Sequence, residues 1–334
     1  MRDLSETQAR VIRELLVSRP GSDRVKCAAA GVPRSTFQQV RKLAYSAGWI
    51  VRRYIPDPSS IGVDRIRVEI GQPFAEKRAN LLGDLVRRAE VVLVWDCPST
   101  IVSVSFERSR SEDGERAKED TSWSRRWVVT PSPSGGEVVA YFDYEGAWSR
   151  WALGEAPKAY PRGMPPRQDG SPSPSKRFRA EDLADLVRRP ILGSGDDGGG
   201  FWPFGGGLPS RLQSLVDNLH AFPWTVPDLA KIPGFARREI ASVVLTSGTW
   251  ASGSDGRGLF QQLVSRCRAT PFLYAFDAKR VVMGFLAPAP TTLMVGRTHI
   301  TAVLAESLRE IEVIREPIGS ISPVINHRYD RLVG

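Results

Sequence analysis

Arginine, glutamine and hydroxyl side chains gather between residues 33 and 49, and these residue types suit hydrogen-bonded recognition of a polar partner. Arg and Gln can each form two hydrogen bonds with a DNA base edge, and Ser or Thr can bond a base or a phosphate. We therefore predict DNA contacts from Arg34, Ser35, Thr36, Gln38, Gln39, Arg41 and Lys42. Of these, Arg41 and Lys42 suit phosphates better than bases. A plain surface helix of a small domain is the competing interpretation.

The spacing of apolar residues in the same stretch predicts the helix that would carry these side chains. Phe37, Val40, Leu43 and Ala44 recur at helical spacing and form one apolar stripe. Ser35 with Gln38 three residues later is a capping-box pattern, which predicts a helix over 35–47. Gly48 then stands where a left-handed helix stop is favoured.

The flanking residues complete the pattern of a winged helix-turn-helix over residues 1–58. Ser5 and Gln8 form another capping-box pattern and open a first helix, and a second helix runs from 22 to 30. A tight turn over 31–33 leads into the third helix, as in a helix-turn-helix. Residues 49–55 read as a strand, with Arg52 and Arg53 near the tip of a wing, where they would hold the DNA backbone.

Charge is distributed unevenly in a way that favours a nucleic-acid partner. Residues 1–55 contain eleven Lys and Arg against four Asp and Glu, a net charge of +7, whereas the whole chain carries +9. A basic excess confined to about a sixth of the length is the electrostatic pattern of a nucleic-acid binder. Double-stranded DNA is therefore the predicted partner, and no basic amphipathic helix with aromatic anchors points to a membrane surface.

The composition of the chain indicates the cellular compartment and the kinds of chemistry to expect. Three widely spaced cysteines give neither a disulfide framework nor paired zinc-ligand spacing, so we predict a reducing cytoplasm and neither metal nor cofactor. The N-terminal residues do not resemble a signal peptide, and no apolar run is long enough to span a membrane. No spacing of nucleophile, base or paired carboxylates indicates a catalytic site, so the expected class is a protein that is not an enzyme.

After the first winged helix, the predicted fold class is α+β. Over 63–153, a strand, an amphipathic helix and two strands give the first half of a ferredoxin-like sandwich, and a further hairpin is expected over 126–144. Residues 154–207 read as a linker with one short helix at 180–189, because eight Pro and ten Gly fall between 155 and 207.

The second half of the chain is predicted to repeat the first. A second, degenerate winged helix is expected over 208–258, with helices over 208–222, from Thr225, and over 236–247. Arg237 and Arg238 would supply a second DNA contact, although 208–260 carries a net charge of only +1. A second α+β domain follows over 259–334.

The N-terminal half resembles the Lrp/AsnC (feast/famine) transcription regulators. The likeness rests on Leu4-Ser5, on the turn and helix start over 31–36, on the run over 46–58 and on the Ile61-Gly62 hinge. The resemblance implies a winged helix joined to a ferredoxin-like domain that dimerises and senses ligands. Family members are about half this length, so the chain resembles a fused pseudo-dimer. The glycine-rich effector pattern of the family is not evident, so an effector has no support.

Three functions remain open at this point. The first is sequence-specific DNA binding by a transcription regulator, with a homodimer formed through the α+β domains. The second is a plasmid or viral replication initiator or partition protein with two winged helices. The third is an enzyme like the sirohaem decarboxylases, which resemble Lrp/AsnC proteins and need histidine and arginine facing a tetrapyrrole. His220, His299 and His327 are each isolated, and an isolated histidine favours a structural role.

Overall fold

The computed structural model divides the chain into two compact units. Unit 1 comprises residues 1–61, 171–237 and 329–334, and unit 2 comprises 62–170 and 238–328. Within these units the structure describes residues 4–16, 23–58, 60–108, 122–131, 138–141, 178–188, 209–218, 220–227, 231–233, 242–267, 271, 273–287, 300–317, 321–325, 328 and 332. In this part of the chain, no helix is long and apolar enough to cross a membrane.

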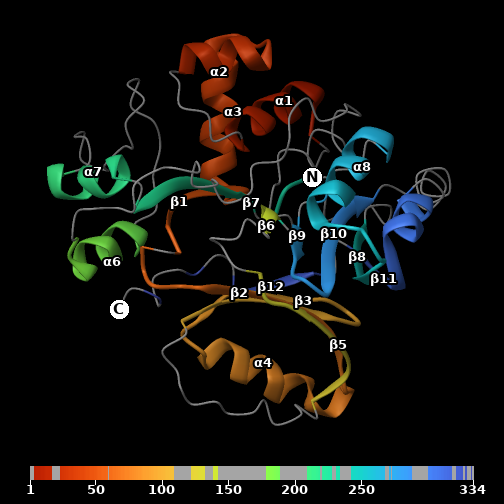
Figure 1. Cartoon of the computed structure of the whole chain (residues 1–334). Helices are drawn as coiled ribbons and strands as arrows, with labels where there is room; N and C mark the ends of the chain where they lie inside the picture. The colour runs from red at the N-terminus through yellow and green to blue at the C-terminus, as the bar shows by residue number, and fades with distance from the viewer. Residues whose placement is uncertain are drawn as a thin grey trace. The chain divides into compact units, whose positions relative to one another are not determined.

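Unit 1 begins with three helices, α1 (Glu6–Leu16), α2 (Asp23–Ala30) and α3 (Arg34–Ser46), drawn in red in Figure 1. The predicted capping box of the first helix is confirmed, because Ser5 N donates to Gln8 Oε1 at 2.8 Å and Gln8 N donates to Ser5 Oγ at 3.2 Å. The three helices share a core that includes Val11, Ile12 and Phe37, all fully buried.

The ends of α3 correct one prediction and confirm another. The helix begins at Arg34 with Pro33 at the N-cap, so the predicted capping box at Ser35 is wrong. Proline fits a helix start because it has no N–H to leave unsatisfied. At the other end Gly48 has a φ of +66°, and Trp49 N donates to Ala44 O at 2.9 Å. This is the predicted glycine stop, in the Schellman form.

The strand after α3 is present, but it does not form the predicted wing. β1 (Ile50–Pro56) pairs antiparallel with β7 (Ala221–Pro227), a strand far along the sequence, and the two make a two-stranded sheet. Arg52 lies opposite Thr225, in the middle of the strand pair. The prediction that Arg52 and Arg53 lie at a wing tip is therefore wrong. Unit 1 also contains α6 (Ala180–Arg188), as predicted, and α7 (Ser210–Asp217).

Unit 2 contains two five-stranded sheets, which confirms the α+β class. The first strand set is β2 (Arg65–Pro73), β3 (Val91–Asp96), β4 (Ile101–Glu107) and β5 (Trp123–Val129). Between β2 and β3 lie η1 (Ala75–Lys77) and α4 (Arg78–Arg87), and α4 covers one face of the sheet (Figure 1). Alternation of apolar and polar residues correctly predicted β2, and short apolar runs predicted β3 and β4.

The second strand set is β8 (Ser242–Trp250), β9 (Leu273–Phe276), β10 (Arg280–Ala287) and β11 (Leu308–Pro317). Helix α8 (Gly256–Cys267) lies between β8 and β9, and a helix over 300–307 precedes β11. Both sets have the same antiparallel strand order. When the strands of each set are numbered along the chain, they lie side by side in the order second, third, first, fourth.

Each sheet is completed by a strand from the end of the other set. β6 (Val138–Tyr141) follows β5 but pairs with β9, and β12 (Ser322–Ile325) follows β11 but pairs with β3. The predicted hairpin over 126–144 is therefore wrong, because β5 and β6 belong to different sheets. Pairing of this kind satisfies backbone groups that a sheet edge would otherwise leave unpaired.

The predicted second winged helix is wrong in two of its helices. Thr225 lies in strand β7 rather than at a helix start, and the expected helix over 236–247 overlaps strand β8. Val243, Val244 and Thr246 are β-branched residues, which favour a strand once a neighbouring strand is available. After Trp250 the chain leads into α8, where the winged helix predicted over 208–258 would require a wing.

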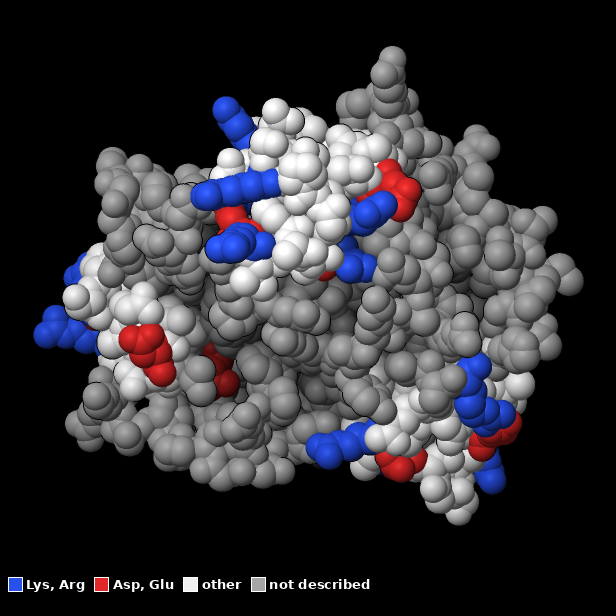
Figure 2. Space-filling model, turned by 90° about the horizontal axis from the view of Figure 1, so that it is seen from above, with Lys and Arg blue, Asp and Glu red and all other residues white. Residues whose placement is uncertain are grey.

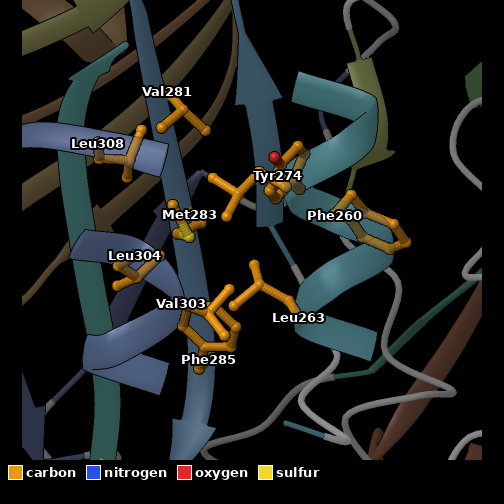
Figure 3. Packing of buried hydrophobic residues seen from close by; sticks show 10 residues of the cluster. Phe260, Leu263, Tyr274, Val281, Met283, Phe285, Val303, Leu304 and Leu308 are labelled. Carbon is orange, nitrogen blue, oxygen red and sulfur yellow. The ribbon is translucent and has the colours of Figure 1, made fainter. Parts of the chain in front are cut away.

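A cluster of buried hydrophobic residues forms the core of the second strand set on the face covered by its helices. Figure 3 shows residues of α8, the strands and the 300–307 helix packed together. Phe260 and Tyr274 meet edge to face with ring centroids 5.0 Å apart, and the buried Tyr274 hydroxyl donates to Gly256 O at 2.7 Å. Burial raises the pKa of Tyr274 well above its usual value, so this hydroxyl stays protonated.

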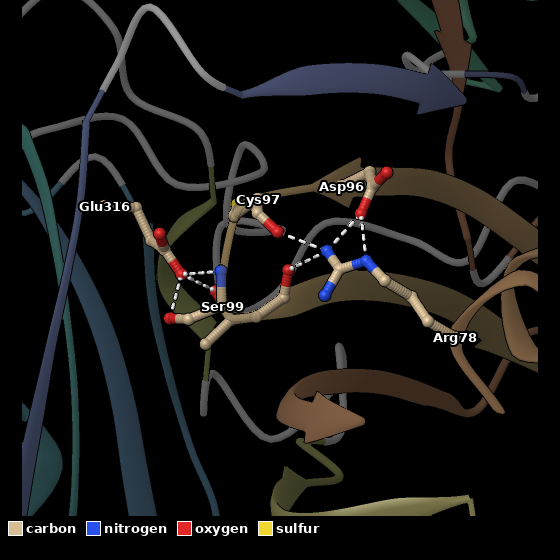
Figure 4. A network of polar contacts seen from close by, with 6 residues as sticks. Arg78, Asp96, Cys97, Ser99 and Glu316 are labelled. Carbon is tan, nitrogen blue, oxygen red and sulfur yellow. Dashed lines mark hydrogen bonds and ion pairs between the residues drawn. The ribbon is translucent and has the colours of Figure 1, made fainter. Parts of the chain in front are cut away.

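A polar network fixes the turn between β3 and β4 from two sides (Figure 4). On one side, Arg78 donates to Asp96 Oδ1 at 3.0 Å and to Thr100 O at 3.1 Å. On the other side, the buried Glu316 carboxylate accepts from Ser99 N at 3.0 Å and from Thr100 Oγ1 at 2.8 Å. Because Glu316 belongs to β11, this carboxylate joins the two strand sets within unit 2.

The thiol of Cys97, in the same turn, gives a test of this network. Burial first, and the Glu316 carboxylate second, raise the pKa of Cys97 from 9.0 to about 12. The folded state therefore keeps the thiol protonated at pH 9, where the unfolded chain is partly thiolate. We expect alkylation of Cys97 by iodoacetamide at pH 9 to be about 100-fold slower in the folded protein than in urea, as measured by mass spectrometry.

The same shift lowers stability at high pH. Between pH 9 and pH 12 the unfolded state loses a proton that the folded state keeps, so the free energy of unfolding falls as pH rises through this window. Replacing the carboxylate by Glu316→Gln removes the second cause of the shift and should speed alkylation of the folded protein. Equal alkylation rates in the folded and unfolded wild-type chain would contradict the burial of this thiol.

Candidate nucleic-acid interface

Helix α3 is positioned by the turn that joins it to α2. Gly31 has a φ of +63°, a conformation that favours glycine, and Val32 N donates to Cys27 O at 3.1 Å. The apolar face of α3 is anchored by Phe37, Val40 and Ala44, which are buried. The opposite face of α3 is thereby held outward from the core of unit 1.

The outward face of α3 carries four of the seven helix residues that the sequence proposes for DNA contact. Arg34, Ser35, Gln39 and Lys42 are exposed, and Thr36, Gln38 and Arg41 are partly buried. Ser35, Gln39, Lys42 and Ser46 follow one another at intervals of four, three and four residues, so they line one face of the helix. Leu43 is 42% exposed, and its predicted place in the buried stripe is wrong.

Arg41 is held by a carboxylate on the preceding helix. Its Nη1 lies 2.6 Å from Asp23 Oδ1 and 2.7 Å from Asp23 Oδ2, and the two side chains are 15% and 11% exposed. This ion pair fastens the start of α2 to the middle of α3. The predicted phosphate contact of Arg41 would require this pair to break, so the geometry gives Arg41 a structural role.

The thiol of Cys27 lies in the electric field of the same groups. Burial and the Asp23 carboxylate raise the pKa of Cys27, and Arg34 and Arg41 oppose that rise. A thiol with a raised pKa stays protonated and is a poor nucleophile at neutral pH. Cys27 is therefore a small, buried, apolar residue of α2.

The remaining predicted contacts lie partly outside what the structure describes. The backbone places Arg52 and Arg53 in β1, and their side chains fall outside the described residues. Arg237 and Arg238 also lie outside the described residues. The structure adds a basic residue that sequence reasoning missed, because Lys231 Nζ lies 3.6 Å from where a Cβ on Gly48 would stand. A lysine at the end of α3 suits the helix dipole.

Figure 2 looks down on α1, α2 and α3 and shows how charge is arranged on this surface. Lys and Arg side chains lie at several points around a central area of uncharged residues, with fewer acidic side chains among them. The basic residues of the three helices are Arg10, Arg13, Arg24, Lys26, Arg34, Arg41 and Lys42. Glu6, Glu14 and Asp23 each pair with one of these arginines.

The described residues give little support for a catalytic or metal-binding site. His220 is buried, lies 3.1 Å through Nδ1 from Ser60 Oγ, and packs on Phe178 with ring centroids 4.5 Å apart. These contacts give it a structural role. His299 and His327 lie outside the described residues. Among the residues that were described, no group of three or more His, Cys, Asp and Glu could hold a metal ion.

Comparison with known proteins gives a likeness in structure alone. No protein-family model matches the chain, and no curated protein matches it. Two solved structures of the siroheme decarboxylase NirDL, one of them in complex with an iron-uroporphyrin III analogue, are similar to it. In each case the TM-score is 0.45 and the sequence identity is 7%. The match covers 97% or 98% of this chain and 96% of the other.

One expectation is corrected by this comparison. The sequence predicted a protein that is not an enzyme, whereas the solved structures that it resembles over nearly its whole length are those of an enzyme. The exclusion of enzymes is therefore withdrawn. At this identity no residue role passes from the decarboxylase to this chain.

The structural role of Arg41 can be tested by truncation. Arg41→Ala would leave the Asp23 carboxylate without its partner in a mostly buried place, so we expect a loss of about 2 kcal/mol in the free energy of unfolding. Lys42→Ala is the matched control on the same helix, and its exposed side chain should cost less than about 0.5 kcal/mol. Urea unfolding of both variants measures the difference, and equal losses would contradict the role given to this ion pair.

Proposed function

We propose that unit 1 binds double-stranded DNA through the exposed face of α3. The observation that carries the proposal is the row of exposed polar side chains, Ser35, Gln39, Lys42 and Ser46, on a helix whose other face is anchored in the core. A helix of this kind fits the major groove, where Gln reads adenine and Arg reads guanine. Arg34 stands at the N-terminal end of α3, which is the end that meets base edges in helix-turn-helix proteins.

The charge of unit 1 supports the same proposal. Non-specific DNA affinity comes mainly from Lys and Arg on phosphates, and the three helices carry more basic than acidic residues. Arg41 is left out of the proposed contacts because Asp23 holds it. Arg34, Ser35, Gln39 and Lys42 form the proposed contact set, and Thr36 and Gln38 stand beside it.

A transcription regulator of the Lrp/AsnC type is the specific role that we favour. The strand order of each set in unit 2 is the order of a ferredoxin-like sheet, which supports the proposed pairing of a helix-turn-helix with ferredoxin-like units. The homodimer expected from the sequence remains a prediction, as does the alternative of a replication initiator or partition protein.

Fluorescence anisotropy across a salt series tests the DNA proposal. We expect the wild-type affinity for duplex DNA to fall steeply and linearly with salt on logarithmic axes. Lys42→Ala should reduce the slope by about 1, and Gln39→Ala should cost about 1–3 kcal/mol on a preferred site selected from a random library. Arg87→Ala, an exposed arginine on α4 of unit 2, is the matched control. Binding without salt dependence, or equal effects of Arg87→Ala and Lys42→Ala, would overturn the proposal.

An enzyme of the sirohaem-decarboxylase type is the second candidate. It is favoured by the presence of two strand sets with the same order in one chain, which agrees with the fused pseudo-dimer that the Lrp/AsnC resemblance implies. An absorbance titration with iron-uroporphyrin III tests it: this candidate predicts a saturable spectral shift at an equimolar ratio, unchanged in Gln39→Ala and Lys42→Ala. A chain that binds DNA with steep salt dependence and gives no spectral shift would remove the candidate.

A further inference from the structure

The two strand sets of unit 2 can be aligned at one glycine. A Cβ on Gly71 of β2 would lie 2.3 Å from the Trp123 ring, and a Cβ on Gly248 of β8 would lie 2.9 Å from Leu308. Trp123 begins β5 and Leu308 begins β11, so each is the first residue of the fourth strand in its set. The two glycines therefore occupy equivalent positions beneath equivalent side chains.

Counting back from these glycines defines four pairs of equivalent positions on the same face of the two sheets. Arg67 and Glu69 lie four and two residues before Gly71, and Val244 and Thr246 lie four and two residues before Gly248. The strand register then gives the residue opposite each of these four in the neighbouring strand. The equivalent pairs are Arg67 and Val244, Glu69 and Thr246, Ser103 and Met283, and Ser105 and Phe285.

The second set fills this face with an apolar core, in which Met283 and Phe285 pack beneath the helices (Figure 3). The first set instead keeps charged and hydroxyl groups there, although they remain buried: Glu69 is 3% exposed and Ser103 is 1% exposed. Burial of such groups is costly. Three of the four equivalent positions in the second set are apolar, and the fourth, Thr246, carries a hydroxyl but no charge. Since the same architecture folds without buried charge there, packing alone does not explain the charged groups of the first set.

Two guanidinium groups converge on the buried carboxylate of Glu69. Arg126 Nε forms an ion pair with Glu69 Oε1, and Arg67 Nε lies 3.5 Å from Glu69 Oε2. Arg126 lies opposite Gly71 in the neighbouring strand, which puts it on the same face, and its guanidinium lies over the Trp123 ring. Among the described residues, the two terminal nitrogens of Arg126 form no hydrogen bond. Both arginines are partly exposed, so the group of charges can be reached from solvent.

Ser103 supplies a second, independent observation. It lies directly opposite Glu69 in the strand pair, and its buried hydroxyl has no hydrogen-bond partner among the described residues. A buried hydroxyl without a partner destabilises the folded state unless something else bonds it. The Ser103 hydroxyl on β4 and the Arg126 guanidinium on β5 thus leave hydrogen-bonding capacity unused on one sheet face, on either side of Glu69 in β2.

We propose that this face of the first sheet binds a small carboxylate. A carboxylate accepts two hydrogen bonds from the planar guanidinium of Arg126, and it can accept another from the Ser103 hydroxyl. Glu69 positions the two arginines and balances part of their charge in the absence of the ligand. The site lies wholly in unit 2, so the test of this proposal is independent of the test of DNA binding by α3.

Thermal unfolding of the full chain with formate, acetate, succinate and citrate tests the site, with sodium chloride at matched ionic strength as the reference. We expect at least one of these carboxylates to raise Tm saturably above the reference. Arg126→Gln should reduce the rise at least fivefold. Arg125→Gln is the matched control, since this neighbouring residue points to the other face of the strand.

Ser103→Ala separates ligand binding from a structural role. Because the hydroxyl lacks a partner, its removal should leave the ligand-free Tm unchanged or raise it, while weakening the carboxylate-dependent rise. A lowered ligand-free Tm in Ser103→Ala would show that the hydroxyl has a structural partner, and would overturn the proposal. No rise with any of the four carboxylates, or an equal loss in Arg125→Gln, would overturn it as well.

Discussion

Backbone hydrogen bonding at the sheet edges is the constraint from which much of unit 2 follows. Each set of four strands ends in an edge whose N–H and C=O groups need partners, and the chain supplies them by sending β6 and β12 across to the opposite set. β11 must therefore run toward the edge of the first sheet before β12 can pair with β3. That path brings Glu316 to the turn between β3 and β4, where one oxygen of its carboxylate accepts hydrogen bonds from Ser99 and Thr100. The polar network of this turn is thus a consequence of strand exchange.

Local signals in the sequence predicted the elements whose stability is also local. The capping box at Ser5 and the stop at Gly48 depend on residues within one helical turn, and both are present. Spacing also predicted β2, α4, β3 and β4, because their apolar faces are regular. The signals that predict these elements lie within each element and do not depend on the segment against which it packs.

Elements whose form depends on a distant partner were predicted wrongly. The apolar spacing over 240–244 fits a helix, but the residues from Ser242 onward form a strand because β10 and β11 lie on either side of it. Thr225 has the side chain of a helix cap, yet it pairs with Arg52 in a two-stranded sheet. Neither partner is visible from spacing alone, since strand pairing joins residues far apart in the sequence.

The prediction of site residues failed for the same reason, because the sequence does not show which side chains contact one another. An arginine such as Arg41 looks available to DNA until the structure places Asp23 against it, and no spacing rule connects these two residues. Arg67, Glu69, Ser103 and Arg126 read as ordinary strand residues in the sequence. Their convergence appears only when the register aligns β2 with both β4 and β5.

Burial changes how much a charged residue reveals about function. An exposed lysine or arginine costs little to keep, so a basic surface such as that of α1, α2 and α3 is a weak indicator unless its side chains line a definite face. A buried carboxylate with two arginines is costly to keep, and the equivalent positions in β8 and β10, which hold Thr246 and apolar residues, show that a face without charge folds in its place. The polar face of the first strand set therefore constrains the function of unit 2 more strongly than net charge constrains that of unit 1.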